Sequence, residues 1–343
     1  MTSSFWQCFL AAELTPQKSR AVLDGLGSFV GDPIDYLLKK APLSDAEKRR
    51  VVTAQASNID PFLASGVRLM VERDFPELLQ EALPPPALFA WGNADFDRPT
   101  IAIVGTRNAS TYGKACAQKF AESFARAGVT VVSGGALGID GAAHQGALKG
   151  EGQTIAVLAG GVDHVYPSMH AGLFRQIRES GSLVSQFALE SRPSPYKFTV
   201  RNGLIAALSL AVLVVEAPAK SGAIRTAEAA SELGRQVFVV PANINMMSFH
   251  GSFNLIRDGA TLVDNPNQVL EALDLEPALL QPELAPASST GEKIMSVLST
   301  NPLAAEFIVE RTGLDTGSVL AELTLLELEG HVIRDGSGYA LRP

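Results

Sequence analysis

The feature that most constrains the fold is a series of short apolar runs in the middle of the chain, which alternate with helix-like segments. The runs cover residues 100–105, 129–134, 154–160, 182–187, 211–217 and 236–242. Uninterrupted runs rich in Val and Ile, separated by helices, are typical of a parallel sheet covered on both faces. We therefore expect a doubly wound, extended Rossmann-like α/β domain with a mostly parallel sheet. Its binding crevice should lie at the carboxyl ends of the strands.

The regions on either side have other patterns, and a chain of 343 residues is long enough for several domains. Residues 1–82 contain capped amphipathic stretches and predict a helical domain of the SAM or helix-hairpin type. The Rossmann-like domain is expected over 83–274, and the proline-rich segment 275–288 is expected to be a linker. Residues 289–343 predict three helices and a hairpin, the outline of a winged-helix domain.

Composition excludes several classes of protein. The two cysteines are far apart and the five histidines show no metal-ligand spacing, so neither a disulfide nor a metal site is expected. The longest apolar run, 204–215, is shorter than the roughly 20 residues that a membrane helix needs. The N-terminus lacks the pattern of a secretory signal. We expect a cytoplasmic protein with no membrane partner.

The charge is unevenly distributed. The net charge is -8, yet residues 100–273 contain more Lys and Arg than Asp and Glu. A surface that binds phosphates would therefore be local to this segment. The predicted third helix of the C-terminal domain has Glu322, Glu327 and Glu329 and no basic residue, which disfavours reading of a DNA major groove.

A glycine-rich turn in VVSGGALGIDGAAHQGAL, residues 131–148, follows the second predicted strand. A dinucleotide site needs G-x-G-x-x-G after the first strand, where this chain has VGTRNASTYG. The acidic residue that would bind a ribose at the end of the second strand is also missing. A dinucleotide-dependent oxidoreductase is therefore disfavoured, and no cofactor is expected. Backbone amides at such turns can still hold phosphates.

Catalytic candidates are few. Ser133, Asp140 and His144 could suggest a triad, and Glu216 at a strand end could suggest a general base. Asp140, however, lies where a helix N-cap belongs, and no nucleophile or metal partner is evident for Glu216. We expect all four residues to be structural and predict no catalytic residue.

A third segment, SRPSPYKFTVRNG at 191–203, follows the fourth predicted strand and interleaves three cations with two aromatic residues. Cations bind the backbone of a single strand of nucleic acid, and aromatic rings stack on its bases. Arg107, in the turn after the first strand, adds a guanidinium group that suits phosphate. Together these residues predict a site for single-stranded nucleic acid.

The chain resembles the DNA-processing protein A (DprA/Smf) family over roughly Phe75 to Val263. The resemblance rests on six stretches in order: IAIVGTRNASTYG, SGGALGIDGAAHQGAL, GQTIAVLAGGVDHVYP, FTVRNGLIAALS, VVEAPAKSGAIRTAEAASELGRQVFVVPAN and GSFNLIRDGATLV. It implies a homodimeric, non-enzymatic protein that binds single-stranded DNA. It also implies that the protein protects incoming DNA and loads the RecA recombinase during natural transformation.

The resemblance also implies which residues contact DNA. By motif, they are Thr106, Arg107, Asn108, Gly134, Gly135, Lys197, Phe198, Arg201 and Asn202. The chain departs from the family pattern at Gly203, where a second arginine is usual, at Ala242, where VPGN is usual, and at Arg225, where a Leu-Ile-Thr sequence is commoner. Whether Arg225 compensates for the cation missing at Gly203 is left open.

A nucleotide-processing enzyme of the phosphoribohydrolase type is the alternative, because that family shares the sheet and a related glycine-rich turn. It requires PGGxGTxxE, and the nearest stretch here, EAPAKSGAIRTAEAA, lacks the paired glycines. A protein that binds single-stranded DNA is therefore the preferred interpretation.

Overall fold

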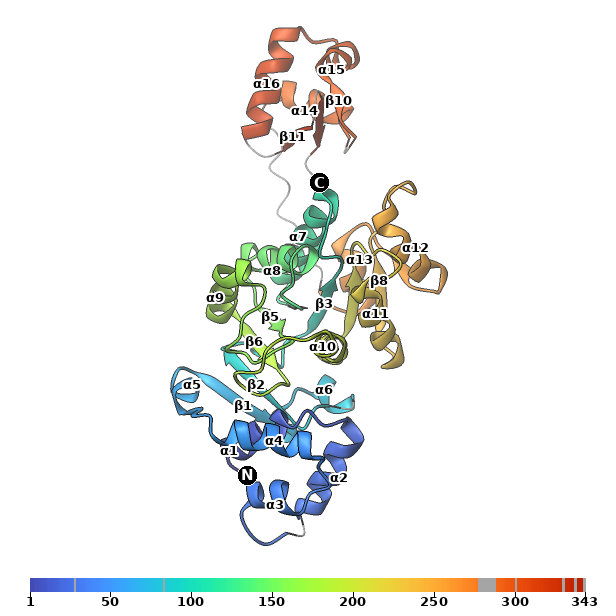
Figure 1. Cartoon of the computed structure of the whole chain (residues 1–343). Helices are drawn as coiled ribbons and strands as arrows, with labels where there is room; N and C mark the ends of the chain where they lie inside the picture. The colour runs from blue at the N-terminus through green and yellow to red at the C-terminus, as the bar shows by residue number, and fades with distance from the viewer. Residues whose placement is uncertain are drawn as a thin grey trace. The chain divides into compact units, whose positions relative to one another are not determined.

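The structure is a computed structural model that describes residues 1–27, 29–82, 84–276, 288–299, 301–328, 331–335 and 338–341. The chain divides into two compact units, Met1–Ala278 and Leu279–Pro343 (Figure 1). Most of the predicted linker, residues 277–287, lies outside the described residues, as does Glu329. The predicted domain boundaries at 82 and 274 stay predictions.

The first unit is built on a nine-stranded sheet, counted over the described residues, in the order β1-β2-β6-β5-β4-β3-β7-β8-β9. The strands are β1 (Val67–Val71), β2 (Ala87–Gly92), β3 (Thr100–Val104), β4 (Thr130–Ser133), β5 (Thr154–Val157), β6 (Ser182–Ser185), β7 (Ala211–Val214), β8 (Gln236–Val239) and β9 (Thr261–Leu262). Every pair from β6 across to β9 is parallel, whereas β2 pairs antiparallel with β1 and β6. The predicted α/β fold with a mostly parallel sheet is confirmed.

Each of the six predicted strands is present, but the sequence did not predict β1, β2 or β9. β2 follows three consecutive prolines, so its residues suggested only an extended boundary. β1 is only five residues long, and its buried positions, Val67 and Met70, are three apart, so its pattern does not distinguish a strand from a helix end. These strands extend the sheet at its edges.

Helices cover both faces of the sheet, as the uninterrupted apolar strands require. Ile101 and Ile103 of β3 pack on one face against α7 and α8, whereas Ala102 and Val104 pack on the other against α10 and α11 (Figure 1). The helices of this part are α6 (Glu77–Glu81), α7 (Thr111–Arg126), α8 (Ile139–Lys149), α9 (Ala171–Ser180), α10 (Pro195–Ala207), α11 (Gly222–Glu232), α12 (His250–Arg257) and α13 (Pro266–Ala272).

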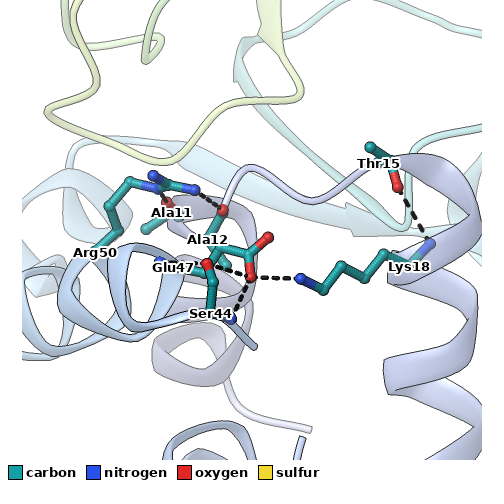
Figure 2. Close-up of polar contacts among 7 residues, drawn as sticks. All are labelled: Ala11, Ala12, Thr15, Lys18, Ser44, Glu47 and Arg50. Carbon is teal, nitrogen blue, oxygen red and sulfur yellow. Dashed lines mark hydrogen bonds and ion pairs between the residues drawn. The ribbon is translucent and has the colours of Figure 1, made fainter. Parts of the chain in front are cut away.

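Five helices precede β1 and pack against the edge of the sheet that carries β2 and β6. They are α1 (Ser3–Ala11), α2 (Pro16–Gly27), α3 (Pro33–Lys39), α4 (Asp45–Gln55) and α5 (Asp60–Ala64). Figure 2 shows how α4 is fixed: Glu47 accepts hydrogen bonds from Ser44 and Lys18, and Arg50 donates to the carbonyl oxygen of Ala12 at 2.5 Å. Burial alone would raise the pKa of Glu47, but these hydrogen bonds lower it to about 2.

The second unit contains α14 (Ser289–Val297), β10 (Leu303–Ala304), α15 (Ala305–Thr312), α16 (Thr316–Leu328), β11 (Val332–Asp335) and β12 (Gly338–Leu341). Asp315 begins α16 as expected, since its Oδ1 accepts a hydrogen bond from the amide of Ser318 at 3.0 Å. A small apolar core joins the three helices to β11. Three helices and a β11-β12 hairpin form the predicted winged-helix outline. Within the described parts of both units, no helix has the length and apolar character to cross a membrane.

Candidate nucleic-acid interface

A crevice of about 460 Å³ lies at the carboxyl ends of β3 and β7. This is where the strand order reverses, since β3 is followed by β4 on one side and β7 by β8 on the other. Open α/β sheets bind ligands at such a switch point. The crevice is lined by the end of β3 and the turn after it, by Ala136 and Asp140 after β4, by α10, and by the start of α11 with the loop before it.

The exposed charged side chains that line this crevice are all positive. They are Arg107, Lys220 and Arg225. The other two charged lining residues, Asp140 and Arg201, are only 6% and 5% exposed. The crevice therefore offers an anion several exposed cations and no exposed carboxylate from its lining.

Arg107 and Phe198 meet at one side of the crevice. The guanidinium carbon of Arg107 lies 4.6 Å from the centre of the half-buried Phe198 ring. Such cation-π contacts hold a guanidinium group in place while leaving its hydrogen-bond donors free for a ligand. Although they are 91 positions apart in sequence, the two residues come together because β3 ends beside the start of α10.

The turn that carries Arg107 is itself well fixed. The amide of Thr106 donates to the carbonyl oxygen of Glu216 at 2.7 Å, and the Thr106 carbonyl accepts from the amide of Ile139. The amide of Asn108 lies 3.3 Å from the Thr106 hydroxyl, and the Asn108 side chain is exposed. Thr106 and Arg107 therefore line the crevice, whereas Asn108, the next residue of the turn, is exposed but is not among the lining residues.

The glycine-rich turn at Gly134 and Gly135 is occupied by a side chain of the protein itself. The carboxylate of Asp140 accepts hydrogen bonds from the amides of Gly134 and Ala136, the latter at 3.4 Å. Burial raises the pKa of Asp140, and the positive charge of Arg201 opposes that shift. Asp140 lies in the first turn of α8 and not at its N-cap, which is Gly138. An internal carboxylate thus takes the place that a phosphate would have at this turn.

Arg201 and Lys197 are buried, although the sequence predicted both as DNA contacts. Arg201 donates from Nη1 to the carbonyl oxygens of Gly134 at 2.5 Å and Val157 at 2.8 Å. Lys197 forms an ion pair of 2.7 Å with Glu13. Its Nζ also donates to the Ser191 hydroxyl and to the carbonyl of Arg192. Both cations have internal acceptors, but Arg201 lines the crevice from a buried position, whereas Lys197 is not among the lining residues.

Asn202 and Arg225 belong to the crevice surface. Asn202 donates from Nδ2 to the carbonyl oxygen of Gly222 at 3.1 Å, which ties α10 to the start of α11. Arg225 reaches back to the hydroxyl of Thr199 at 3.0 Å. A Cβ atom on Gly203 would meet no atom within 4 Å. Arg225 therefore supplies a cation close to α10, and position 203 has space for another.

The catalytic candidates do not come together. The Ser133 hydroxyl donates to the carbonyl of Ile103 at 2.6 Å, and His144 is paired through Nδ1 with the Thr154 hydroxyl at 2.7 Å. Glu216 is fully buried and accepts two hydrogen bonds from Ser110 at the start of α7. In the structure each of these side chains supports the sheet or a helix end.

Sequence reasoning missed two residues of this region, Lys220 and Tyr166. Lys220 follows the end of β7, so its place at the carboxyl edge of the sheet was a signal that could have been used. Tyr166 lies in the loop after β5, and its ring is 6.0 Å from that of Phe198. Its motif, DHVYP, belongs to a stretch that carries the family resemblance, and the sequence alone did not mark it as part of a binding site.

The fold and site define an extended Rossmann-type α/β protein that has a cationic crevice at its switch point and a separate winged-helix unit. Residues 66–274 match the family model described as DNA recombination-mediator protein A, and residues 276–338 match the DprA winged helix domain. The chain therefore belongs to the DprA/Smf family, and the predicted family is confirmed.

Named relatives agree with this assignment. The chain is 36% identical over 303 residues to Protein Smf of Synechocystis, which covers 76% of both chains. It is 36% identical over 275 residues to Protein Smf of Escherichia coli, covering 77% of this chain and 74% of that one.

Two solved structures are similar as well. DNA processing protein A from Streptococcus pneumoniae has a TM-score of 0.67 at 30% identity and covers 80% of this chain and 99% of its own. The protein from Helicobacter pylori, whose structure was described for its single-stranded DNA binding mode, has a TM-score of 0.56 at 29% identity. It covers 62% of this chain and 99% of its own.

Proposed function

We propose that this protein is a recombination mediator that binds single-stranded DNA in the crevice at β3 and β7 and catalyses no reaction on it. The observation that supports this most strongly is the set of exposed cations in the crevice, with Arg107 seated on the Phe198 ring. A phosphate backbone needs such cations, and unpaired bases need aromatic or guanidinium faces. The single-stranded DNA binding mode described for the Helicobacter pylori relative supports the same ligand.

The nine predicted site residues divide into two groups in this proposal. Direct contacts come from the exposed or half-exposed members Thr106, Arg107, Asn108, Phe198 and Asn202. The other four members are buried and hold the turn after β4 and α10 in place. They are Gly134, Gly135, Lys197 and Arg201.

A salt titration of the full chain on a fluorescent single-stranded oligonucleotide tests the proposal. Arg107→Ala should weaken binding roughly tenfold to a hundredfold, because a charge-assisted contact is lost. It should also lower the slope of log affinity against log salt by about 0.7. Arg49→Ala is the matched control, since Arg49 is an exposed arginine on α4, outside the crevice. Equal binding by wild type and Arg107→Ala at every salt concentration would refute the crevice as the DNA site.

Family membership supports the finer parts of the proposal: a cytoplasmic homodimer that protects incoming DNA and loads the RecA recombinase during natural transformation. Strand-exchange reactions with RecA on protein-coated single strands test the loading step, and Arg107→Ala should lower the rate of filament formation. Sedimentation of the full chain tests the dimer. A nucleotide-processing enzyme is less well supported, because the stretch EAPAKSGAIRTAEAA lacks the paired glycines that such an enzyme requires.

A further inference from the structure

Tyr166 is the most exposed aromatic side chain in ring contact with the crevice residues. It lies in the loop between β5 and α9, and 51% of its surface is exposed. Its ring meets Phe198 edge to face, with the ring centres 6.0 Å apart and the planes inclined by 60°. Three segments distant in sequence thus form one row of side chains: Arg107 after β3, Phe198 on α10, and Tyr166 after β5.

Phe198 itself has little free ring surface. The Arg107 guanidinium lies over the ring at 4.6 Å, and the guanidinium carbon of Arg201 lies 5.9 Å from its centre. Tyr166 lies against the same ring. Phe198 is only partly exposed, whereas Tyr166 is 51% exposed, so Tyr166 offers more free ring surface than Phe198.

We propose that Tyr166 is a base-stacking residue for the single strand, and that its edge-to-face contact with Phe198 holds it beside Arg107. The inference rests on the proposed function and adds a contact to it. The neighbourhood favours a nucleic-acid strand over an apolar protein partner, because the exposed charges of the adjoining crevice are all cations. Stacking on an aromatic ring accepts any base, so this contact adds affinity without sequence preference.

The first test compares binding of the full chain to a single-stranded thymidine oligonucleotide. Tyr166→Ala and Tyr166→Leu should weaken binding roughly 5-fold to 100-fold, the range for the loss of one stacked base. Tyr166→Phe keeps the ring and should bind within twofold of wild type. Met169→Ala is the matched control, since Met169 is 80% exposed in the same loop and is not aromatic. Because no phosphate contact is removed, the salt slope of Tyr166→Ala should equal that of wild type, unlike that of Arg107→Ala.

The second test uses an abasic strand of the same length, which retains the phosphates. On this strand wild type and Tyr166→Ala should bind equally, because there is no base to stack. A deficit of Tyr166→Ala that persists on the abasic strand, or normal binding of Tyr166→Ala to thymidine strands, would overturn the inference. If Arg107→Ala loses binding in the same series while Tyr166→Ala does not, only this inference fails. If wild type binds no single strand, the proposed function fails with it.

Discussion

Arg201 offers the sharpest test of how the crevice is built, because its role in the framework and a role in DNA contact predict different outcomes. Replacement of Arg201 by Met removes the donor to two buried carbonyl oxygens, those of Gly134 and Val157. Each unpaired buried acceptor costs roughly 1–3 kcal/mol. It also removes the stronger of the two positive charges that act on the buried Asp140, Arg107 being the other, and loss of a buried charge's partner costs up to roughly 3–5 kcal/mol.

Because these costs overlap, we expect the free energy of unfolding to fall by about 5 kcal/mol in Arg201→Met, against a total of roughly 5–15 kcal/mol for a typical domain. Urea unfolding followed by tryptophan fluorescence measures this, since Trp6 and Trp91 both lie in the Met1–Ala278 unit. Arg107→Met replaces an exposed arginine of the same crevice, so its midpoint of urea unfolding should equal that of wild type. If Arg201→Met is as stable as wild type yet fails to bind DNA, the reasoning is wrong and Arg201 is a direct contact.

The pH dependence of the stability of Arg201→Met tests whether Asp140 is the source of its lost stability. Burial raises the pKa of Asp140 above its ordinary value of 3.8, and Arg201→Met removes the charge that opposes this rise. A carboxyl whose pKa is higher in the folded state binds a proton on folding, so stability falls as the pH rises above 3.8. The stability gap between Arg201→Met and wild type should therefore narrow as the pH is lowered. Adding Asp140→Asn to the variant should abolish this narrowing.

Three further predictions follow from contacts around the same framework. Gly203→Arg should tighten binding of single-stranded DNA and raise the salt slope by about 0.7, whereas Gly203→Ala should leave both unchanged. Burial lowers the pKa of His144 from 6.5 to about 3, so this residue alone should lower the free energy of unfolding by about 3 kcal/mol between pH 7.5 and 4.5. In urea unfolding, His144→Asn should therefore lose less stability than wild type over this range. Glu13→Gln should cost about 2 kcal/mol of stability without changing the salt slope, because Lys197 keeps two other acceptors. A steeper slope would instead mean that the freed lysine reaches a phosphate.

The sheet was predictable because its signal is local. Each predicted strand is a continuous apolar run, and the side chains of β3 need only alternate between two covered faces to be buried. The rule that open α/β sheets bind ligands at the carboxyl ends of their strands also predicted where the crevice lies, and Arg107, in the turn after β3, lines it. β1, β2 and β9 escaped prediction for local reasons: β2 directly follows three prolines, β1 has no strand-like burial pattern, and β9 has only two residues.

Whether a particular side chain is buried was not predictable from such local patterns. Lys197 is buried because Glu13, which is 184 positions earlier, reaches it, and Gln7 of α1 holds both backbone groups of Leu189. The sequence of the 191–203 segment contains no sign of either contact. From sequence alone, a cation in a basic motif is therefore interpreted as a ligand contact. Only the residues packed on it show that it is buried.

The geometry of α10 explains how one short motif can serve both as framework and as binding surface. Lys197 and Arg201 are four residues apart and so share one side of the helix, which is buried and held by Glu13 and by the Gly134 turn. Phe198 and Asn202 are displaced by one position and share the neighbouring side, which lines the crevice. The two buried cations thus fix the rotation of the helix at successive turns, and that rotation sets the direction in which Phe198 faces Arg107. If the proposed function holds, a substitution at either cation should weaken DNA binding by turning the helix, whether or not the cation itself contacts the strand.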